Sequence, residues 1–153
     1  MSFLNFLNMI EIKIINKSGN SNPEYVTMGS AGMDLRAYLH EDIVLKPGER
    51  VTIPTGIYIE LPDGLQAEVR PRSGLALKYG ITVLNTPGTV DSDYRGEIKV
   101  ILINLSSENF VIRNGERIAQ LVITKYEKIS WINVSEIEST KRAGGGFGHS
   151  GRE

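Results

Sequence analysis

The chain has 153 residues, of which 41% are hydrophobic and 23% charged, and this composition is typical of one globular domain. A formal net charge of −1 argues against binding of DNA or RNA through an overall basic surface. The absence of cysteine excludes disulfides, thiol catalysis and thiolate metal sites, and with only His40 and His149 a histidine-rich metal centre is not expected.

The first eight residues differ from the rest of the chain. They include Phe3, Leu4, Phe6 and Leu7 but no basic segment and no small-residue cleavage site. They also fall well short of the roughly 20 apolar residues that span a bilayer. We therefore expect neither a secretory signal nor a membrane helix. Because there are no disulfides to keep oxidised, we expect a cytoplasmic protein in which residues 1–8 form a disordered prefix.

Short runs rich in Ile, Val and Thr, separated by turn residues, predict a domain of β-strands from residue 9 to residue 138. The runs occupy residues 10–16, 51–60, 65–71, 80–85, 96–106, 109–127 and 129–134. An Asn-Gly turn within 109–127 predicts a hairpin. Residues 73–80 lack β-branched residues and predict one short helix. This pattern indicates an all-β sandwich, jelly roll or barrel, folds that often cover their sheet edges by assembly.

Two stretches are candidates for anion binding. In GSAGMDLRA, Asp34 lies among small and apolar residues, where a carboxylate is either a turn or cap residue or lies near a metal or phosphate site. In VRPRSGLA, Arg72 precedes Ser73 and Gly74 at the predicted start of the helix. A helix N-terminus attracts anions, and Arg favours phosphate or carboxylate. A surface arginine beside an N-cap serine explains the same residues.

A glycine-bounded loop at residues 85–98 carries two carboxylates, Asp91 and Asp93, followed by Tyr94. It does not match a calcium loop, because an arginine takes the next ligand position and a leucine stands where a bidentate glutamate is needed. Two interpretations remain for this loop: an acidic hairpin tip, or a carboxylate base beside an aromatic wall.

The chain ends in KRAGGGFGHSGRE. The GFGHSG segment has the spacing of a dinucleotide-binding fingerprint, but that fingerprint opens a helix, and only two residues follow Gly151. Taken together, the two stretches that join arginine to glycine, the isolated carboxylates and the two aromatic residues suit a phosphorylated ligand with a flat ring. The sequence therefore indicates a nucleotide site.

Five segments resemble, in this order, the five motifs of the homotrimeric dUTPase family: AGMDLRA, PRSGLA, NTPGTVDSDYRGEI, GERIAQ and RAGGGFGHSG. The resemblance extends from about Met9 to Gly151. It implies a jelly-roll-like β-barrel subunit, assembled as a homotrimer with active sites between subunits, and a flexible C-terminal arm at residues 139–153. The implied reaction is hydrolysis of dUTP to dUMP and pyrophosphate with Mg²⁺, which limits uracil incorporation into DNA and supplies dUMP for thymidylate synthesis.

The resemblance also implies roles for single residues. Asp91 would be the general base that activates a water for attack on the α-phosphorus. Tyr94 would pack on the deoxyribose and exclude a 2′-hydroxyl, and Asn85 would contact the uracil edge. The phosphate oxygens would be bound by Arg72, Ser73, Gly74 and Gln120. Mg²⁺ would sit mainly on the phosphates and on waters, with Asp34 reached through water.

In the arm, the resemblance implies that Arg142 grips the γ-phosphate and Phe147 stacks over the uracil. Glycines such as Gly148 would let bare backbone amides approach the phosphates. Ala143 departs from the family pattern, which usually has glycine at this position. A Cβ there matters if the backbone must adopt a positive φ, so closure of the arm is expected to be altered.

Two alternatives to a dUTP hydrolase are open. A dCTP deaminase has a similar fold but lacks the tyrosine-bearing third motif in this form. A non-catalytic, nucleotide-binding trimer would not need Asp91, Arg72 and the C-terminal motif, all of which are present. Neither a nucleic acid nor a membrane is expected as a partner.

Overall fold

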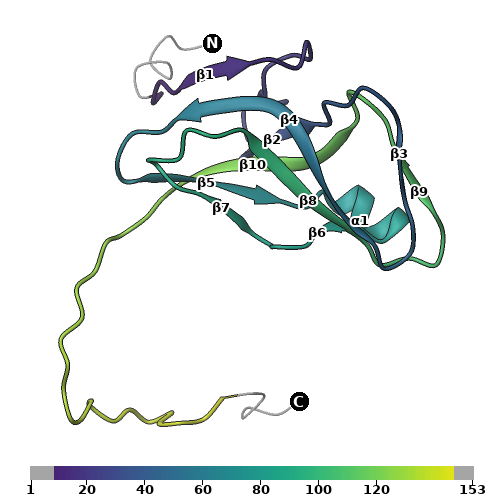
Figure 1. The fold of residues 1–153 in the computed structure, drawn as a ribbon. Helices are drawn as coiled ribbons and strands as arrows, with labels where there is room; N and C mark the ends of the chain where they lie inside the picture. Colours follow the sequence, from purple (N-terminus) through teal and green to yellow (C-terminus); the bar gives the residue numbers. More distant parts are fainter. Residues whose placement is uncertain (1–8, 147–153) are drawn as a thin grey trace.

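The computed structural model describes residues 9–146, which form two packed antiparallel β-sheets, a two-stranded ribbon and one helix (Figure 1). The first sheet has the order β1-β4-β8-β6, the second has the order β2-β10-β5-β7, and β3 pairs with β9. The elements are β1 (Lys13–Asn16), β2 (Gly32–Arg36), β3 (Ile43–Leu45), β4 (Arg50–Glu60), β5 (Leu65–Arg70), α1 (Ser73–Tyr79), β6 (Ile81–Val83), β7 (Gly88–Val90), β8 (Ile98–Asn104), β9 (Phe110–Ile112) and β10 (Arg117–Lys125). The expected all-β, jelly-roll-like fold with one short helix is confirmed.

The core lies between the two sheets because each sheet turns an apolar face inward. Along β8 buried residues alternate with more exposed ones, as in a strand with one face on the core. Ile53, Val100 and Leu102 of the first sheet and Leu35 and Ala119 of the second belong to one cluster of buried side chains. Removing this apolar surface from water is the main favourable term in folding.

A bulge in β4 ties the first sheet to the 85–98 loop. Gly56 lies in the bulge with a φ of 71°, a conformation that glycine adopts without steric cost. Its N–H donates to Glu97 Oε1 over 2.8 Å, and Thr55 Oγ1 donates to the Ile98 carbonyl over 2.6 Å. These bonds fix one end of the loop against the sheet.

The outer face of the first sheet carries apolar residues of β8 among polar neighbours, with Thr52 opposite Ile101 and Arg50 opposite Ile103. Ile101 and Ile103 alternate with the buried residues of β8 and are half-buried on its other face. Beside them, Leu84 and Leu105 are exposed. Together these four side chains form an apolar patch that is available for contact with another molecule.

The strand expected at residues 129–134 is wrong. These residues have no regular secondary structure, and Trp131 and Ile132 are 89% and 84% exposed. Branched and aromatic residues favour a strand only where a neighbouring strand supplies hydrogen bonds, and within residues 9–146 none pairs with this segment. The chain after β10 instead runs away from the sheets (Figure 1).

Other expectations are met or missed for local reasons. The helix expected at 73–80 is confirmed as α1, which ends where Gly80 takes a φ of 65°. The strands β2, β3 and β7 are absent from the sequence prediction. Among the described residues, no helix is long and apolar enough to cross a membrane. The expected prefix, residues 1–8, lies outside the described residues.

Candidate functional site

Strand β10 brings the predicted phosphate-binding residues together. It lies between β2 and β5 in the second sheet. Gln120 is directly opposite Asp34 on β2 and Arg70 on β5. Arg72 follows β5 by two residues. Side chains that are far apart in the sequence are therefore neighbours at one place on the sheet.

Asp34 is paired with two arginines, and we call Asp34, Arg72 and Arg117 the arginine cluster. Arg72 Nε lies 2.9 Å from Asp34 Oδ1, and Arg117 Nη1 donates to Asp34 Oδ2 over 3.1 Å. Arg72 Nη1 also donates to the Arg117 carbonyl over 3.1 Å. The exposed fractions of the side chains are 22% for Asp34, 26% for Arg72 and 48% for Arg117. The cluster is held by its own contacts and remains accessible to a ligand.

Gln120 is fixed beside the cluster. Its Nε2 donates to the Pro71 carbonyl over 2.9 Å. The amide fits because the residue next to it is glycine: a Cβ on Gly32 would overlap Gln120 Oε1. Gly32 is a site requirement that the sequence analysis did not identify, although it belongs to the quoted AGMDLRA segment.

The start of α1 lies next to the arginine cluster. Arg72 is the N-cap residue, with an extended backbone (φ −96°, ψ 128°), and Ser73 is the first helical residue. The alternative in which Ser73 caps the helix is therefore wrong, because no side chain caps this end. The first N–H groups of a helix have no acceptor within it, so those of Ser73 and Gly74 are free of helical bonds. No acidic residue lies in this first turn.

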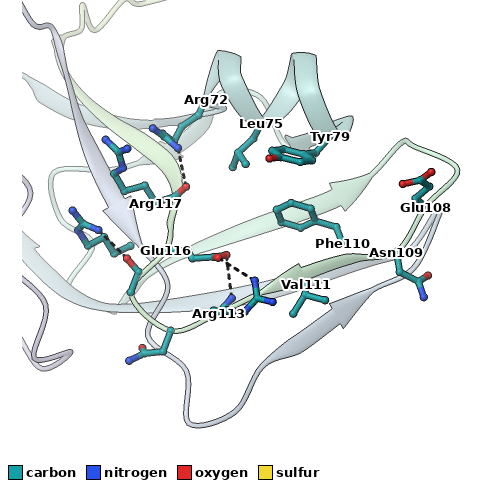
Figure 2. A pocket seen from close by; sticks show the side chains of 13 residues that line it. Arg72, Leu75, Tyr79, Glu108, Asn109, Phe110, Val111, Arg113, Glu116 and Arg117 are labelled. Atoms are coloured by element: carbon teal, nitrogen blue, oxygen red, sulfur yellow. Dashed lines mark hydrogen bonds and ion pairs between the residues drawn. The ribbon is translucent and has the colours of Figure 1, made fainter.

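A pocket of about 860 Å³ opens beside Arg72 and Arg117 (Figure 2). Arg72 and Arg117 line one end of it. The pocket continues past Leu75 to Tyr79 and Phe110, whose rings are 5.4 Å apart between α1 and β9. The position of β9 near the phosphate residues was not predicted, because no local pattern indicates how the β3–β9 ribbon packs on α1.

The loop at residues 85–98 presents a second group of predicted residues. Asn85, Asp91 and Tyr94 are all exposed. The Tyr94 N–H donates to the Asp91 carbonyl over 3.2 Å, and Tyr94 Oη donates to the Glu97 carbonyl over 3.0 Å. These bonds fold the ring back over the loop, where a Cβ on residue 96 would overlap it. Gly96 is thus needed for the position of the Tyr94 ring.

Within residues 9–146, the two groups line different pockets. Asp91 and Tyr94 line a separate pocket of about 220 Å³. Arg72 and Arg117 line the larger one.

The described part of the C-terminal arm carries Arg142 in a turn. The Ala143 N–H donates to the Thr140 carbonyl over 2.9 Å, and Arg142 Nε donates to the Gly145 carbonyl over 2.8 Å. Ala143 has a φ of 43°, in the left-handed region that costs a residue with a Cβ about 1 to 2 kcal/mol. Phe147 and Gly148 lie outside the described residues.

A metal ion would have few protein ligands here. Within residues 9–146, no group of three or more His, Asp or Glu side chains is placed to hold one. Asp34 offers a single carboxylate, with each oxygen engaged by one arginine. This set fits a divalent cation whose ligands come mainly from a bound phosphate and water, as Mg²⁺ prefers.

The dUTPase family model matches residues 18–151 of the chain. A curated relative from Finegoldia magna, named deoxyuridine 5′-triphosphate nucleotidohydrolase, is 56% identical over 142 residues. The matched region covers 93% of this chain and 99% of the relative.

The fold of this chain is also similar to solved dUTPase structures. A variant of the Staphylococcus bacteriophage 80α dUTPase with dUpNHpp superposes with a TM-score of 0.79 at 25% identity, covering 94% of this chain and 99% of that chain. A variant of the phage φ11 dUTPase, described with a structural Mg(II) ion, gives a TM-score of 0.74 at 22% identity over 83% of this chain and 98% of that chain. At 22% identity, the similarity to the φ11 dUTPase shows a shared fold.

Proposed function

The chain belongs to the dUTPase family, and on this premise we propose that it hydrolyses dUTP to dUMP and pyrophosphate. The observation that carries the proposal is the match, over nearly the whole chain, to a 56% identical relative that bears this activity in its name. The two groups of residues have the matching chemistry: one offers cations for phosphates, and the other a carboxylate beside an aromatic ring.

The triphosphate binds at the start of α1. The Arg72 guanidinium offers donors in a planar fork that suits phosphate oxygens. Ser73 and Gly74 supply N–H groups that the helix leaves free. Gln120, whose amide is held by the Pro71 carbonyl, contacts the phosphates from beside these groups. Groups held in place before the ligand arrives lose little freedom on binding, which favours affinity.

Asp91 acts as the general base. It takes a proton from a water whose oxygen attacks the α-phosphorus, and the bond from that phosphorus to the bridging oxygen breaks to release pyrophosphate. A carboxylate is a weak base, so its contribution depends on holding the water in line with the leaving group. Tyr94 packs against the deoxyribose and leaves no room for a 2′-hydroxyl, and Asn85 contacts the uracil edge.

Mg²⁺ is the cofactor of this reaction. When bound, it polarises the phosphates and neutralises part of their charge. Asp34 would hold it through water, since each of its oxygens already has an arginine partner.

The active form is a homotrimer with sites between subunits. Two observations support this assembly: the 85–98 loop and the arginine cluster line separate pockets, and the outer face of the first sheet is apolar at Ile101, Ile103 and Leu105. Pairing the loop of one subunit with the cluster of another would complete a site.

The fold divides into a β-domain at residues 9–138 and a C-terminal arm at 139–153, and the arm closes the site. Arg142 contacts the γ-phosphate, Phe147 stacks over the uracil, and Gly148 lets a backbone amide approach the phosphates. Because the proposed substrate is a free nucleotide and the chain has no cysteine, we propose that the protein acts in the cytoplasm.

An assay of pyrophosphate release with dUTP, UTP, dTTP and dCTP, each with Mg²⁺, tests the proposed function. We expect dUTP to be cleaved in strong preference to the other three. Preferential cleavage of dCTP would point to a different pyrimidine enzyme. No cleavage of any of the four would leave a binding protein and overturn the proposed hydrolysis.

A further inference from the structure

The chain leaves β10 and β7 at the same edge of the second sheet. Both strands run antiparallel to β5, which lies between them, so both end at one edge. Asp91 directly follows β7, and Tyr126 directly follows β10. The Tyr126 N–H donates to the Gly64 carbonyl over 3.1 Å, which continues the pairing of β10 with β5 beyond the last residue of the strand. The backbone of Tyr126 is therefore fixed near the loop that carries Asp91.

The side chain of Tyr126 contacts this loop at Ser92. Tyr126 is half-buried, and its Oη lies 3.4 Å from Oγ of Ser92, a buried residue that is 9% exposed. The distance is long for a bond between hydroxyls, but hydrogen bonds of an active site are often long in the free enzyme and shorten when the substrate binds. Lys128 Nζ lies 5.9 Å from the centroid of the Tyr126 ring, within range of a cation–π contact. A tyrosine from another strand thus reaches the residue next to Asp91.

Asp91 takes its position from the main chain around it. The Asp91 carbonyl accepts the Tyr94 N–H over 3.2 Å. The Ser92 carbonyl accepts a bond from Arg95 Nη1 over 2.7 Å, and the Ser92 hydroxyl meets Tyr126. Asp91 itself is exposed, and these bonds hold its main chain and Ser92 rather than its carboxylate. The direction in which the Asp91 side chain leaves the loop is therefore fixed at Ser92.

A purely structural role explains the two hydroxyls poorly. Two apolar side chains of the same shape would stabilise this edge of the sheet about as well as a pair of neutral hydrogen-bonding groups. A hydrogen bond adds direction, because it fixes the distance and angle between its partners. Direction matters beside a general base, since a carboxylate is effective only when it holds the attacking water in line with the leaving group.

On the basis of the proposed function, we infer that Tyr126 is a positioning residue for the general base. Its hydroxyl holds the Ser92 side chain, and Ser92 fixes the main chain from which Asp91 projects toward the water. Tyr126 lines neither the pocket beside Arg72 nor the pocket of Asp91. It therefore acts through Ser92 and not by contact with the nucleotide, so its loss affects turnover and not binding.

Steady-state release of pyrophosphate from dUTP with Mg²⁺, and calorimetric binding of the non-hydrolysable analogue α,β-imido-dUTP, test this role. For Tyr126→Phe, which removes only the hydroxyl, we expect kcat to fall about 3-fold to 10-fold, as for loss of one hydrogen bond. KM and the affinity for the analogue should change by less than about 2-fold, because the substitution leaves ground-state binding intact. Tyr25→Phe is the matched control, since Tyr25 is an exposed tyrosine in the segment before β2, and its kcat should equal that of the wild type.

Ser92→Ala removes the other half of the contact and should lower kcat by a similar factor. The double variant should be no slower than either single variant, because the two side chains share one interaction. Unchanged kcat for Tyr126→Phe, a loss of activity that lies in KM, or additive effects of the two substitutions would overturn the inference. Thermal unfolding identifies any variant that does not fold, and failure of both single variants to fold would assign the contact to stability instead.

The same measurements separate this inference from the proposed function. Wild-type protein that binds the analogue but hydrolyses no dUTP would overturn both, because there would be no base to position. An active wild type with an unaffected Tyr126→Phe variant would overturn the role of Tyr126 alone.

Discussion

The arginine cluster and the C-terminal segment at residues 127–146 differ in how their residues are held in place. Asp34 and Arg117 lie on the paired strands β2 and β10, and Arg72 follows β5 by two residues. Arg72 and Arg117 both bond to Asp34, and beside the cluster Gln120 bonds to Pro71. The segment has no strand, and its hydrogen bonds at Arg142 and Ala143 are to its own neighbours in the chain.

This difference indicates which region favours ligand binding and which region opposes it through loss of entropy. Groups already fixed on a sheet gain contacts with little loss of entropy, whereas a segment that must be ordered loses about 1 to 2 kcal/mol per residue. We therefore expect the cluster to determine the affinity for phosphates and closure of the arm to determine kcat. Variants in either region test this difference.

The largest effect is expected from Asp91→Asn, which removes the base and keeps the shape of the loop. We predict that turnover falls by about 10²-fold to 10⁴-fold, the contribution usual for a general base. Affinity for α,β-imido-dUTP should stay within about 3-fold, because a base contributes to the transition state more than to binding. Stopped-flow release of pyrophosphate measures the first quantity and calorimetry the second. Turnover at the wild-type rate would refute the assignment of Asp91.

Deletion of residues 141–153 should have the next largest effect. We predict a fall in kcat of about 10²-fold, through loss of positioning in the closed complex. The melting temperature should be unchanged, because the core cluster of buried side chains lies entirely N-terminal to this segment. Calorimetric unfolding and steady-state kinetics on the same preparation test both statements. Normal turnover of the shortened chain would show that the arm is not a lid.

A smaller effect is expected from Gly32→Ala, which changes the paired strands beside the arginine cluster. The new Cβ would overlap Gln120 Oε1 and displace the amide from Pro71. We predict that KM for dUTP rises by about 3-fold to 10-fold, as for loss of one hydrogen bond. Gly29→Ala is the control, because a Cβ there would meet no atom within 4 Å. Equal KM values for the two variants would mean that Gln120 does not contact the ligand.

The smallest effect is expected at Ala143. Its φ of 43° is one that glycine adopts freely. Ala143→Gly should relieve about 1 kcal/mol if the turn persists in the closed arm, which corresponds to about 5-fold tighter binding of the analogue. Gly144→Ala serves as the control, since it has open space around it. Weaker binding by Ala143→Gly would show that the stiffness of alanine helps closure.

Sequence patterns predict the elements whose signal is local. The run at 96–106 is confirmed as β8 because its branched residues alternate across a strand with partners on both sides. The run at 129–134 has a similar composition but lacks a partner within the described chain, so the same reasoning gives a strand that is not there. Local composition cannot report whether a neighbouring strand exists.

Within the site, the motifs identify the residue types but not their contacts. The pairing of Asp34 with Arg72 depends on β10 lying between β2 and β5, which no local pattern encodes. Arg117 belongs to the quoted GERIAQ segment, but the direction of its side chain could not be predicted, for a further reason. Strict alternation assigns it to the core face with Ala119, and only the bulge between Arg117 and Ala119 reverses that assignment.

The separation of the two pockets has a genetic consequence. If Asp91 of one subunit serves the arginine cluster of another, a chain that carries Asp91→Asn and a chain that carries Arg72→Ala are both inactive alone. Mixed trimers of the two would contain sites in which an intact loop meets an intact cluster. Co-expression of the two defective alleles would then restore part of the activity, whereas a single chain with both substitutions would restore none.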